Sequence, residues 1–421
     1  MTTMGVQIVI NRLTLENGVR IMAEANTDVR SVSIGIWVKT GSRNEEKKEN
    51  GISHLIEHML FKGTKTRSAQ EIAEAFDRIG GQVNAFTAKE YTCYYAKVLD
   101  EHAEFALDVL QDMFFHSEFE ELELYREKNV VFEEIKMVED TPDDIVHDLL
   151  SEASYGSSSL AYPILGDPHA LESFTEKDLR DYMARFYTGD RVVVSVAGHF
   201  NEALLEALKE TFAQVPPRSQ QFDVPCSTFQ PTVKYRQKES EQAHLCLGYP
   251  GLEIASDDMF ALILLNNSLG GSMSSRLFQT IREERGLCYS VFSYHSAYEH
   301  AGMLTLYAGT QLSQLEELMT AIEAVTSSFA KQGMTQKELE NGKEQLKGNL
   351  MLGLESTNSR MSRNGKNEML LQEHRTLDEL VKDINNVSIE QVNDLARRLL
   401  EEKPAVSLIS SSETIPTNVF A

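Results

Sequence analysis

The side chains best suited to chemistry in this sequence lie in a short apolar stretch, GISHLIEHML, from Gly51 to Leu60. Residues four apart share one face of a helix, so His54 and His58 present two ring nitrogens to one metal ion. Glu57 lies beside this pair, where its carboxylate can accept a proton from a metal-activated water. A chance match is the alternative, because a chain with 11 His and many Glu produces so short a pattern by composition alone.

A catalytic zinc ion usually has three protein ligands and leaves a fourth position to water, so a third ligand is needed. The helical stretch YREKNVVFEEIKMVED, from Tyr125 to Asp140, contains Glu127 and Glu134. These glutamates are seven residues apart, which puts them two turns along one helix face. For either residue alone, a solvated helix face is the ordinary interpretation. The preceding H-x-x-E-H, which is a zinc-peptidase motif, favours a metal role.

With both parts together, the chain resembles the inverzincin metallopeptidases, the family of pitrilysin, insulin-degrading enzyme and the mitochondrial processing peptidase. It is similar above all to bacterial processing-protease-like members and to the β subunit of the mitochondrial enzyme. The resemblance implies one Zn²⁺ per chain, bound by His54, His58 and Glu134, the last of which follows His58 by 76 residues. It implies further that Glu57 is the general base and that Glu127 supports the site or binds substrate.

Several predicted elements surround these residues in the first half of the chain. Residues 1–26 alternate in polarity around a turn at Glu16-Asn17-Gly18, which predicts a strand hairpin. Ser31 to Thr40 predicts a central strand, Ala103 to Phe115 a helix and Arg191 to Gly198 a further strand.

A glycine turn at Gly80-Gly81 leads into one more predicted strand. The resemblance implies that the edge of this strand pairs with the backbone of a peptide substrate, through Asn84, Ala85, Phe86 and Thr87. Binding by strand addition tolerates many substrate sequences, because main-chain hydrogen bonds supply the affinity.

The composition changes in the middle of the chain, where four of the ten prolines fall in a polar stretch between Val215 and Thr232. Such a stretch is typical of an interdomain linker. We therefore predict one domain at 1–213, a linker at 214–232 and a second domain at 233–421.

The order of elements repeats beyond the linker, which indicates an internal duplication. The repeated elements are a strand at 243–249, a helix at 257–269, a strand pair within 289–307, and helices at 314–329 and 337–354. The predicted fold class is α+β, with two structurally similar domains, each an antiparallel-rich sheet flanked by helices.

The metal chemistry is absent from the second copy. Its helix from Met259 to Leu269 has neither His nor acid in the ligand positions. In the alignment of the two halves, Glu344 falls opposite Glu127, but Met351 falls opposite Glu134. The sequence therefore predicts one metal-competent half.

The second half carries a different pair, Arg282 and Tyr289, seven residues apart. A surface Arg with a half-buried Tyr is the ordinary interpretation. The resemblance implies instead a catalytic and substrate-binding pair that faces the active site, holds the substrate carbonyls and steadies the tetrahedral intermediate. An Arg and a phenol are suitable donors to developing oxyanion charge.

The formal net charge of −24 argues against nucleic acid as a partner, since binding a phosphate backbone requires clustered Lys and Arg. It favours basic peptides instead. We expect neither membrane insertion nor export, because the sequence has no apolar run of 18 residues and no signal-peptide pattern. Four separated cysteines without a C-x-x-C pair suit a cytoplasmic protein with reduced thiols.

These observations predict a cytoplasmic zinc metalloendopeptidase that cleaves short or unfolded, presequence-like peptides. The resemblance implies a closed chamber and a dimer, expected to be a homodimer, in which Arg282 and Tyr289 of one chain complete the zinc site of the other. A metal-retaining, non-catalytic scaffold subunit of a processing-peptidase-like complex is the alternative, because some members of the family are inactive.

Overall fold

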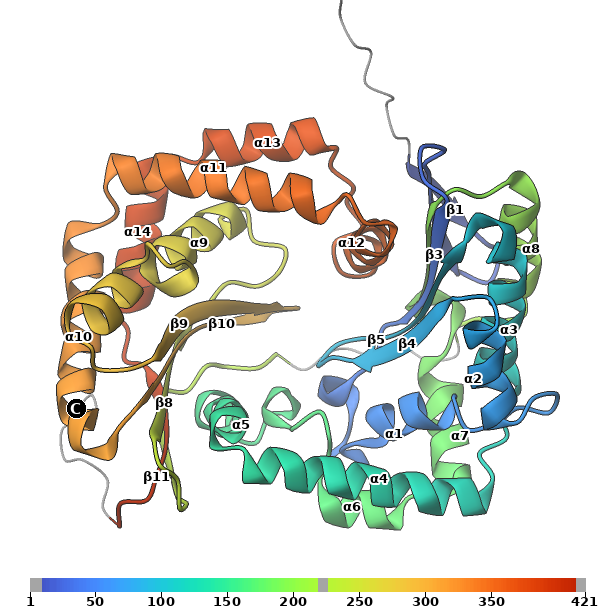
Figure 1. Ribbon diagram of the computed structural model, residues 1–421, viewed down its shortest axis with the longest axis horizontal. Helices are drawn as coiled ribbons and strands as arrows, with labels where there is room; N and C mark the ends of the chain where they lie inside the picture. Colours follow the sequence, from blue (N-terminus) through green and yellow to red (C-terminus); the bar gives the residue numbers. More distant parts are fainter. Residues whose placement is uncertain (1–9, 219–225, 414–421) are drawn as a thin grey trace, which may run out of the picture. The chain divides into compact units, whose positions relative to one another are not determined.

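The computed structural model describes residues 10–218 and 226–413, and Figure 1 shows their helices and strands. The described chain forms two compact units. Unit 1 comprises residues 10–134, 163–218 and 352–374, and unit 2 comprises residues 135–162, 226–351 and 375–413. Each unit has one sheet and its own buried apolar clusters, which confirms the predicted α+β class.

The sheet of unit 1 has six strands in the order β1-β2-β6-β3-β5-β4. They are β1 (Ile10–Thr14), β2 (Arg20–Ala25), β3 (Ser31–Val38), β4 (Gln82–Thr87), β5 (Thr92–Leu99) and β6 (Val192–Gly198). β2 and β6 are parallel, and all other neighbours are antiparallel. β3 and β6 are buried along almost their whole length, as expected for apolar runs in the middle of a sheet, whereas the edge strand β4 alternates between exposed and half-buried residues.

The sheet of unit 2 has five strands in the order β7-β11-β8-β10-β9. They are β7 (Val233–Gln237), β8 (Ala243–Pro250), β9 (Ser290–Tyr298), β10 (Ala301–Thr310) and β11 (Ala405–Ser410). This order matches the order β2-β6-β3-β5-β4 in unit 1, strand for strand. The pairs β2-β6 and β7-β11 are parallel, and the remaining pairs of these five-strand sets are antiparallel. The shared topology supports the predicted internal duplication, with β1 as the addition in unit 1.

Most helices lie between corresponding strands in the two halves of the sequence. Unit 1 contains α1 (Ile52–Met59), α2 (Ala69–Asp77), α3 (Ala103–His116), the first part of α4 (Glu121–Asp140), α6 (Pro168–Ser173), α7 (Glu176–Phe186), α8 (Glu202–Phe212) and α12 (Thr357–Leu370). Unit 2 contains the end of α4, α5 (Pro142–Tyr155), α9 (Met259–Asn266), α10 (Leu315–Gln332), α11 (Gln336–Gly353), α13 (Leu377–Asn386) and α14 (Ile389–Leu400). No helix in the described ranges has the length and apolar character needed to cross a membrane.

Helices α5 and α12 pack on the sheet built by the other half of the sequence. α5 packs on β7, β8 and β11, and α12 packs on β2, β3 and β6. In unit 1, a Cβ at Gly365 of α12 would lie 2.3 Å from Trp37 Nε1 of β3, so only glycine permits this close packing. The buried carboxylate of Glu368 pairs with Arg12 at 2.9 Å and Arg20 at 3.5 Å.

The compact units therefore differ from the predicted domains at 1–213 and 233–421 in two segments. Residues 135–162 belong to unit 2, and residues 352–374 belong to unit 1. Periodicity in the sequence identifies these helices, but it does not contain the information on which of two similar sheets each helix covers.

Candidate metal centre

Helix α1 carries both histidines on a short element that its own apolar residues anchor. Ile52, Leu55, Ile56 and Met59 are buried, so the helix cannot rotate without exposing them. The chain enters the helix through Gly51, whose φ of 99° is a left-handed conformation that favours glycine.

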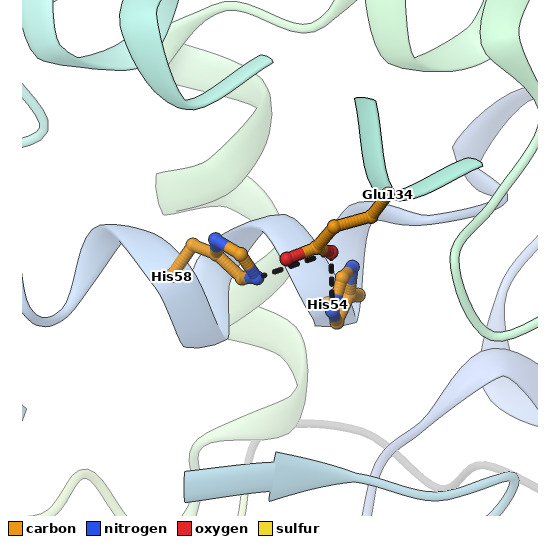
Figure 2. A group of neighbouring side chains, drawn as sticks. All are labelled: His54, His58 and Glu134. Atoms are coloured by element: carbon orange, nitrogen blue, oxygen red, sulfur yellow. Dashed lines mark ion pairs between the residues drawn. The ribbon is translucent and has the colours of Figure 1, made fainter. Parts of the chain in front are cut away.

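The predicted ligands His54, His58 and Glu134 converge (Figure 2). Their donor atoms all lie within 4.8 Å of one another, and Glu134 Oε2 is 3.7 Å from Nε2 of both histidines. Two atoms bound at about 2.1 Å to one tetrahedral ion lie roughly 3.4 Å apart, so this spacing fits a shared zinc ion better than direct hydrogen bonds. Burial and the neighbouring His58 lower the pKa of His54 to about 4, which keeps this imidazole neutral and able to bind a metal near pH 7.

Glu57 lies outside this group of three residues and contacts strand β4, a contact that the sequence did not predict. The hydroxyl of Thr87, on β4, donates a hydrogen bond of 2.6 Å to Glu57 Oε2. Burial raises the pKa of Glu57, and the Thr87 bond and His58 oppose that shift. A carboxylate with a raised pKa, held by a single hydroxyl, is suited to accept and return a proton.

Glu127 is buried and joins His58 to a cation that the sequence analysis missed. Its Oε2 lies 3.1 Å from His58 Nδ1, and its Oε1 lies 2.8 Å from Lys62 Nζ. Burial raises the pKa of Glu127, but the bonds from His58 and Lys62 outweigh that effect and lower it overall. A carboxylate on Nδ1 directs Nε2 of the same ring toward the metal position. The signal in the sequence was the Lys four residues after His58, which lies just beyond the end of α1.

Burial alone lowers the pKa of His58, yet the hydrogen bond with Glu127 and the nearby carboxylates raise it overall. His58 and His54 therefore differ in their electrostatic surroundings, although they are neighbours on one helix with ring centroids 4.6 Å apart. The candidate metal ligand His58 has the carboxylates of Glu57, Glu127 and Glu134 around it, and this negative surrounding favours a bound cation.

Glu45 is a second buried acid next to α1, and unlike Glu127 it was not identified from the sequence. It accepts hydrogen bonds from the backbone N–H of Gly51 at 2.8 Å, from that of Ser53 at 2.9 Å and from Asn50 Nδ2 at 2.9 Å. Burial raises its pKa, and these bonds oppose the shift. A carboxylate at the N-terminus of α1 stabilises the free amides and the positive end of the helix dipole.

A pocket of about 440 Å³ adjoins the metal centre in unit 1. Its lining is mixed, with Glu57, His58, Lys62, Asn84 and Glu127 as the polar residues and Phe61, Ala69, Ile72, Ala73 and Val83 as the apolar ones. The pocket therefore has room for a side chain next to the predicted general base.

Four of the six residues predicted to bind substrate, Asn84, Ala85, Phe86 and Thr87, lie on β4, at one edge of the sheet. Strand alternation puts Ala85 and Thr87 on one face and Asn84 and Phe86 on the other. Thr87 contacts Glu57, whereas the exposed ring of Phe86 packs edge-to-face against Trp37. No described strand pairs with the outer edge of β4, so its main chain is open to an added strand.

Arg282 and Tyr289 belong to unit 2 and lie together there. The Arg282 guanidinium sits 4.7 Å from the ring centroid of Tyr289 and 4.7 Å from that of Phe278. Arg282 lies in a π-helical segment, Phe278–Glu284, and 78% of Tyr289 is exposed to solvent. Two aromatic rings thus hold the guanidinium while the phenol stays free to contact a ligand.

Unit 2 has no counterpart of the metal centre among its described residues. Glu344, opposite Glu127 in the repeat, pairs with Lys347 at 2.6 Å on the same helix, and Met351, opposite Glu134, is exposed. Within the described ranges, the one group of three side chains close enough to hold a metal ion is His54, His58 and Glu134, on α1 and α4.

Comparison with known proteins gives two family matches and close relatives. Residues 20–168 match the model described as insulinase (peptidase family M16), and residues 173–346 match the model described as peptidase M16 inactive domain. The protein named uncharacterized zinc protease YmxG of Bacillus subtilis (strain 168) is 59% identical over 408 residues, which cover 97% of this chain and 100% of that protein. The uncharacterized zinc protease SCO5738 of Streptomyces coelicolor is 39% identical over 412 residues, covering 95% of this chain and 89% of that protein.

Solved structures agree on the fold. A Pseudomonas fluorescens chain described as a peptidase M16 inactive domain superposes with a TM-score of 0.89 at 20% identity, covering 97% of this chain and 99% of that one. A protease from Helicobacter pylori gives a TM-score of 0.88 at 20% identity, covering 96% and 99%. With both of its halves matched and full-length relatives above 30% identity, the chain belongs to the insulinase family of peptidases, family M16.

Proposed function

We propose that this protein is a zinc metalloendopeptidase. The observation that carries the proposal is the convergence of His54, His58 and Glu134, with the Glu57 carboxylate nearby but outside this group. Two imidazoles and one carboxylate form the donor set of many catalytic zinc sites, which keep a position open for water. The names of the relatives, which call them zinc proteases, support the same metal and reaction.

In the proposed mechanism, His54, His58 and Glu134 would hold a zinc ion, which would supply Lewis acidity for the scissile carbonyl and for a water molecule. Glu57 takes the proton from that water and later returns it to the leaving amine. Thr87 keeps the Glu57 side chain in place through its 2.6 Å hydrogen bond. Glu127 holds the ring of His58, and Lys62 balances the charge of Glu127.

We propose that substrates are short or unfolded peptides, including presequence-like ones. A peptide that adds to the open edge of β4 passes the metal centre, because Thr87 on that strand reaches Glu57. We further propose a cytoplasmic homodimer that encloses a chamber, in which Arg282 and Tyr289 of one chain serve the zinc of its partner. The four cysteines, all free, suit a reducing compartment.

The first test is metal content together with cleavage by the purified chain. We expect about one zinc per chain and hydrolysis of an internally quenched, unstructured peptide. Removing zinc with a chelator should abolish cleavage, and adding zinc back should restore it, because the ion is required for the chemistry. A purified chain that retains zinc but cleaves no peptide would instead support the alternative function, that of a non-catalytic scaffold subunit.

The second prediction concerns substrate charge. With a net charge of −24, the protein is expected to attract basic peptides at low ionic strength. A peptide flanked by Lys should show a kcat/KM at least about tenfold higher than its matched Glu-flanked counterpart. The advantage should shrink above roughly 0.1 M salt, where the Debye length falls to about 10 Å. Equal kcat/KM values for the two peptides at low salt would rule out electrostatic attraction of basic substrates. The negative surface charge would then serve only to keep the protein in solution.

A further inference from the structure

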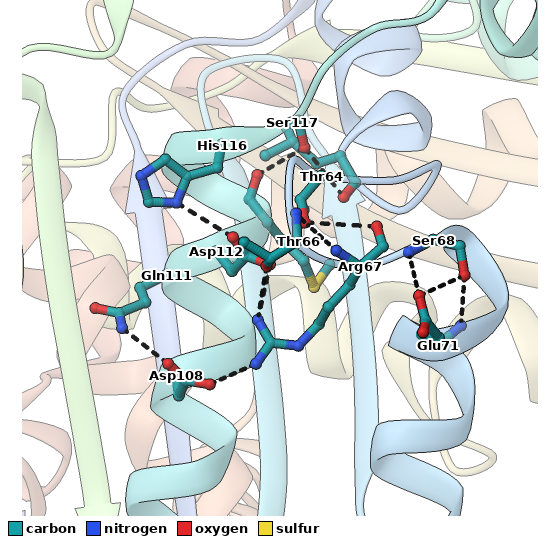
Figure 3. A network of polar contacts seen from close by, with 12 residues as sticks. Thr64, Thr66, Arg67, Ser68, Glu71, Asp108, Gln111, Asp112, His116 and Ser117 are labelled. Carbon is teal, nitrogen blue, oxygen red and sulfur yellow. Dashed lines mark hydrogen bonds and ion pairs between the residues drawn. The ribbon is translucent and has the colours of Figure 1, made fainter.

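The buried side chain of Asp112 lies outside the candidate metal centre and binds side chains of the loop that follows α1 (Figure 3). Asp112 lies on α3 and is 5% exposed. Its Oδ2 accepts hydrogen bonds of 2.7 Å from each of Thr64 Oγ1, Thr66 Oγ1 and Arg67 Nη1. Its Oδ1 lies 3.2 Å from Nδ1 of His116, one helical turn further along α3.

The backbone of the same loop is fixed as well. Thr64 bridges to Ser117 at the end of α3, and Lys65 N donates to His116 O at 3.2 Å. Burial raises the pKa of Asp112, but its hydrogen bonds to Thr64, Thr66 and Arg67 outweigh that effect and lower it overall. The carboxylate therefore stays ionised, and one of its oxygens holds three side chains of this loop, those of Thr64, Thr66 and Arg67.

The same loop contains Lys62, whose ammonium group pairs with Glu127. Lys62 lies three residues after the last residue of α1 and two residues before Thr64. Its ammonium is 2.8 Å from Glu127 Oε1, and Glu127 Oε2 is 3.1 Å from His58 Nδ1. A Lys side chain has four rotatable bonds, so it holds one position only when its backbone is fixed. Asp112 holds the chain two residues beyond Lys62, through the side chain of Thr64.

We propose that Asp112 is a positioning residue of the metal centre and acts on His58 through Lys62 and Glu127. Without Asp112, the loop loosens, Lys62 leaves Glu127, and Glu127 no longer holds the His58 ring in the orientation that binds metal. This inference rests on the proposed function for its effect on catalysis, but its effect on zinc affinity is independent of any substrate.

The test is a double-mutant cycle with two readouts: zinc affinity by chelator competition, and kcat and KM for an unstructured peptide. Asp112→Asn is expected to lower the zinc affinity about tenfold and kcat about tenfold, with KM nearly unchanged. The reason is that loss of a residue that supports a metal ligand lowers metal affinity or activity by about 10–100-fold. Lys62→Met should cause a loss of similar size. In the double variant, Asp112→Asn should add less than about a twofold loss, because both residues act through the same contact.

Two further variants complete the design. Glu71→Gln removes one carboxylate charge from the neighbouring capping box with Ser68, drawn in Figure 3, and should leave zinc affinity and kcat unchanged. Thr66→Val removes a single donor to Asp112 and should give a smaller loss in the same direction, which keeps the test valid if Asp112→Asn fails to fold.

The inference is wrong if Asp112→Asn or Thr66→Val binds zinc as the parent protein does, or if the losses from Asp112→Asn and Lys62→Met multiply in the double variant. Multiplied losses would mean that Asp112 stabilises the fold without a specific link to the metal. If the parent chain binds zinc but cleaves no peptide, the proposed function fails, and the zinc affinities still decide the role of Asp112.

Discussion

Glu57→Gln is expected to bind zinc as tightly as the parent protein and to lose on the order of 10²–10⁴-fold in peptide cleavage. The zinc should remain because the Glu57 carboxylate lies outside the group formed by His54, His58 and Glu134. The Gln amide still accepts the hydrogen bond from Thr87, so the local structure is kept. The loss is chemical, because an amide does not take a proton from water. Metal analysis and kcat/KM on one sample measure both quantities.

The matched controls are variants of the ligands themselves. His58→Ala and Glu134→Ala are each expected to lose zinc and cleavage together, since a site with two remaining ligands binds the ion weakly. A Glu57→Gln protein that contains no zinc would contradict the assignment, because it would make Glu57 a ligand. Full cleavage by the same variant would contradict the role of Glu57 as the base.

Mixing two inactive chains is expected to restore activity if the sites are shared across a dimer. One chain carries Glu57→Gln, and the other carries Arg282→Ala with Tyr289→Phe. In a mixed dimer, the zinc centre of the second chain meets the intact Arg282 and Tyr289 of the first. Equal mixing should recover about a quarter of the parent activity, because half of the dimers are mixed and each mixed dimer has one complete site.

The control mixture combines the Glu57→Gln chain with a Glu134→Ala chain. Neither chain then supplies a complete zinc centre, so no activity should return even though Arg282 and Tyr289 are intact in both. Subunit exchange is verified separately with two affinity tags on the mixed species. Exchange without recovered cleavage, or an active species that sediments as a monomer, would show that Arg282 and Tyr289 act within their own chain or not at all.

The sequence by itself was enough to predict the local arrangement of the candidate metal centre. Helical spacing puts His54 and His58 on one face, and the same spacing sets Glu57 beside them. Periodicity also predicted strand β3, helices α3 and α4, and the repeat that relates the two sheets. These features depend on residues close together in the chain, or on a pattern that occurs twice, and both kinds of information are present in a single sequence.

The tertiary structure alone decided which distant residues support that chemistry. Thr87 reaches Glu57, Glu127 joins Lys62 to His58, and Glu45 accepts hydrogen bonds at the start of α1. It also decided that α5 and α12 cover the sheets of the opposite halves. The physical reason is that a short-range pattern states which face of an element is apolar, but the choice among several apolar partners follows from packing and buried hydrogen bonds across the whole chain.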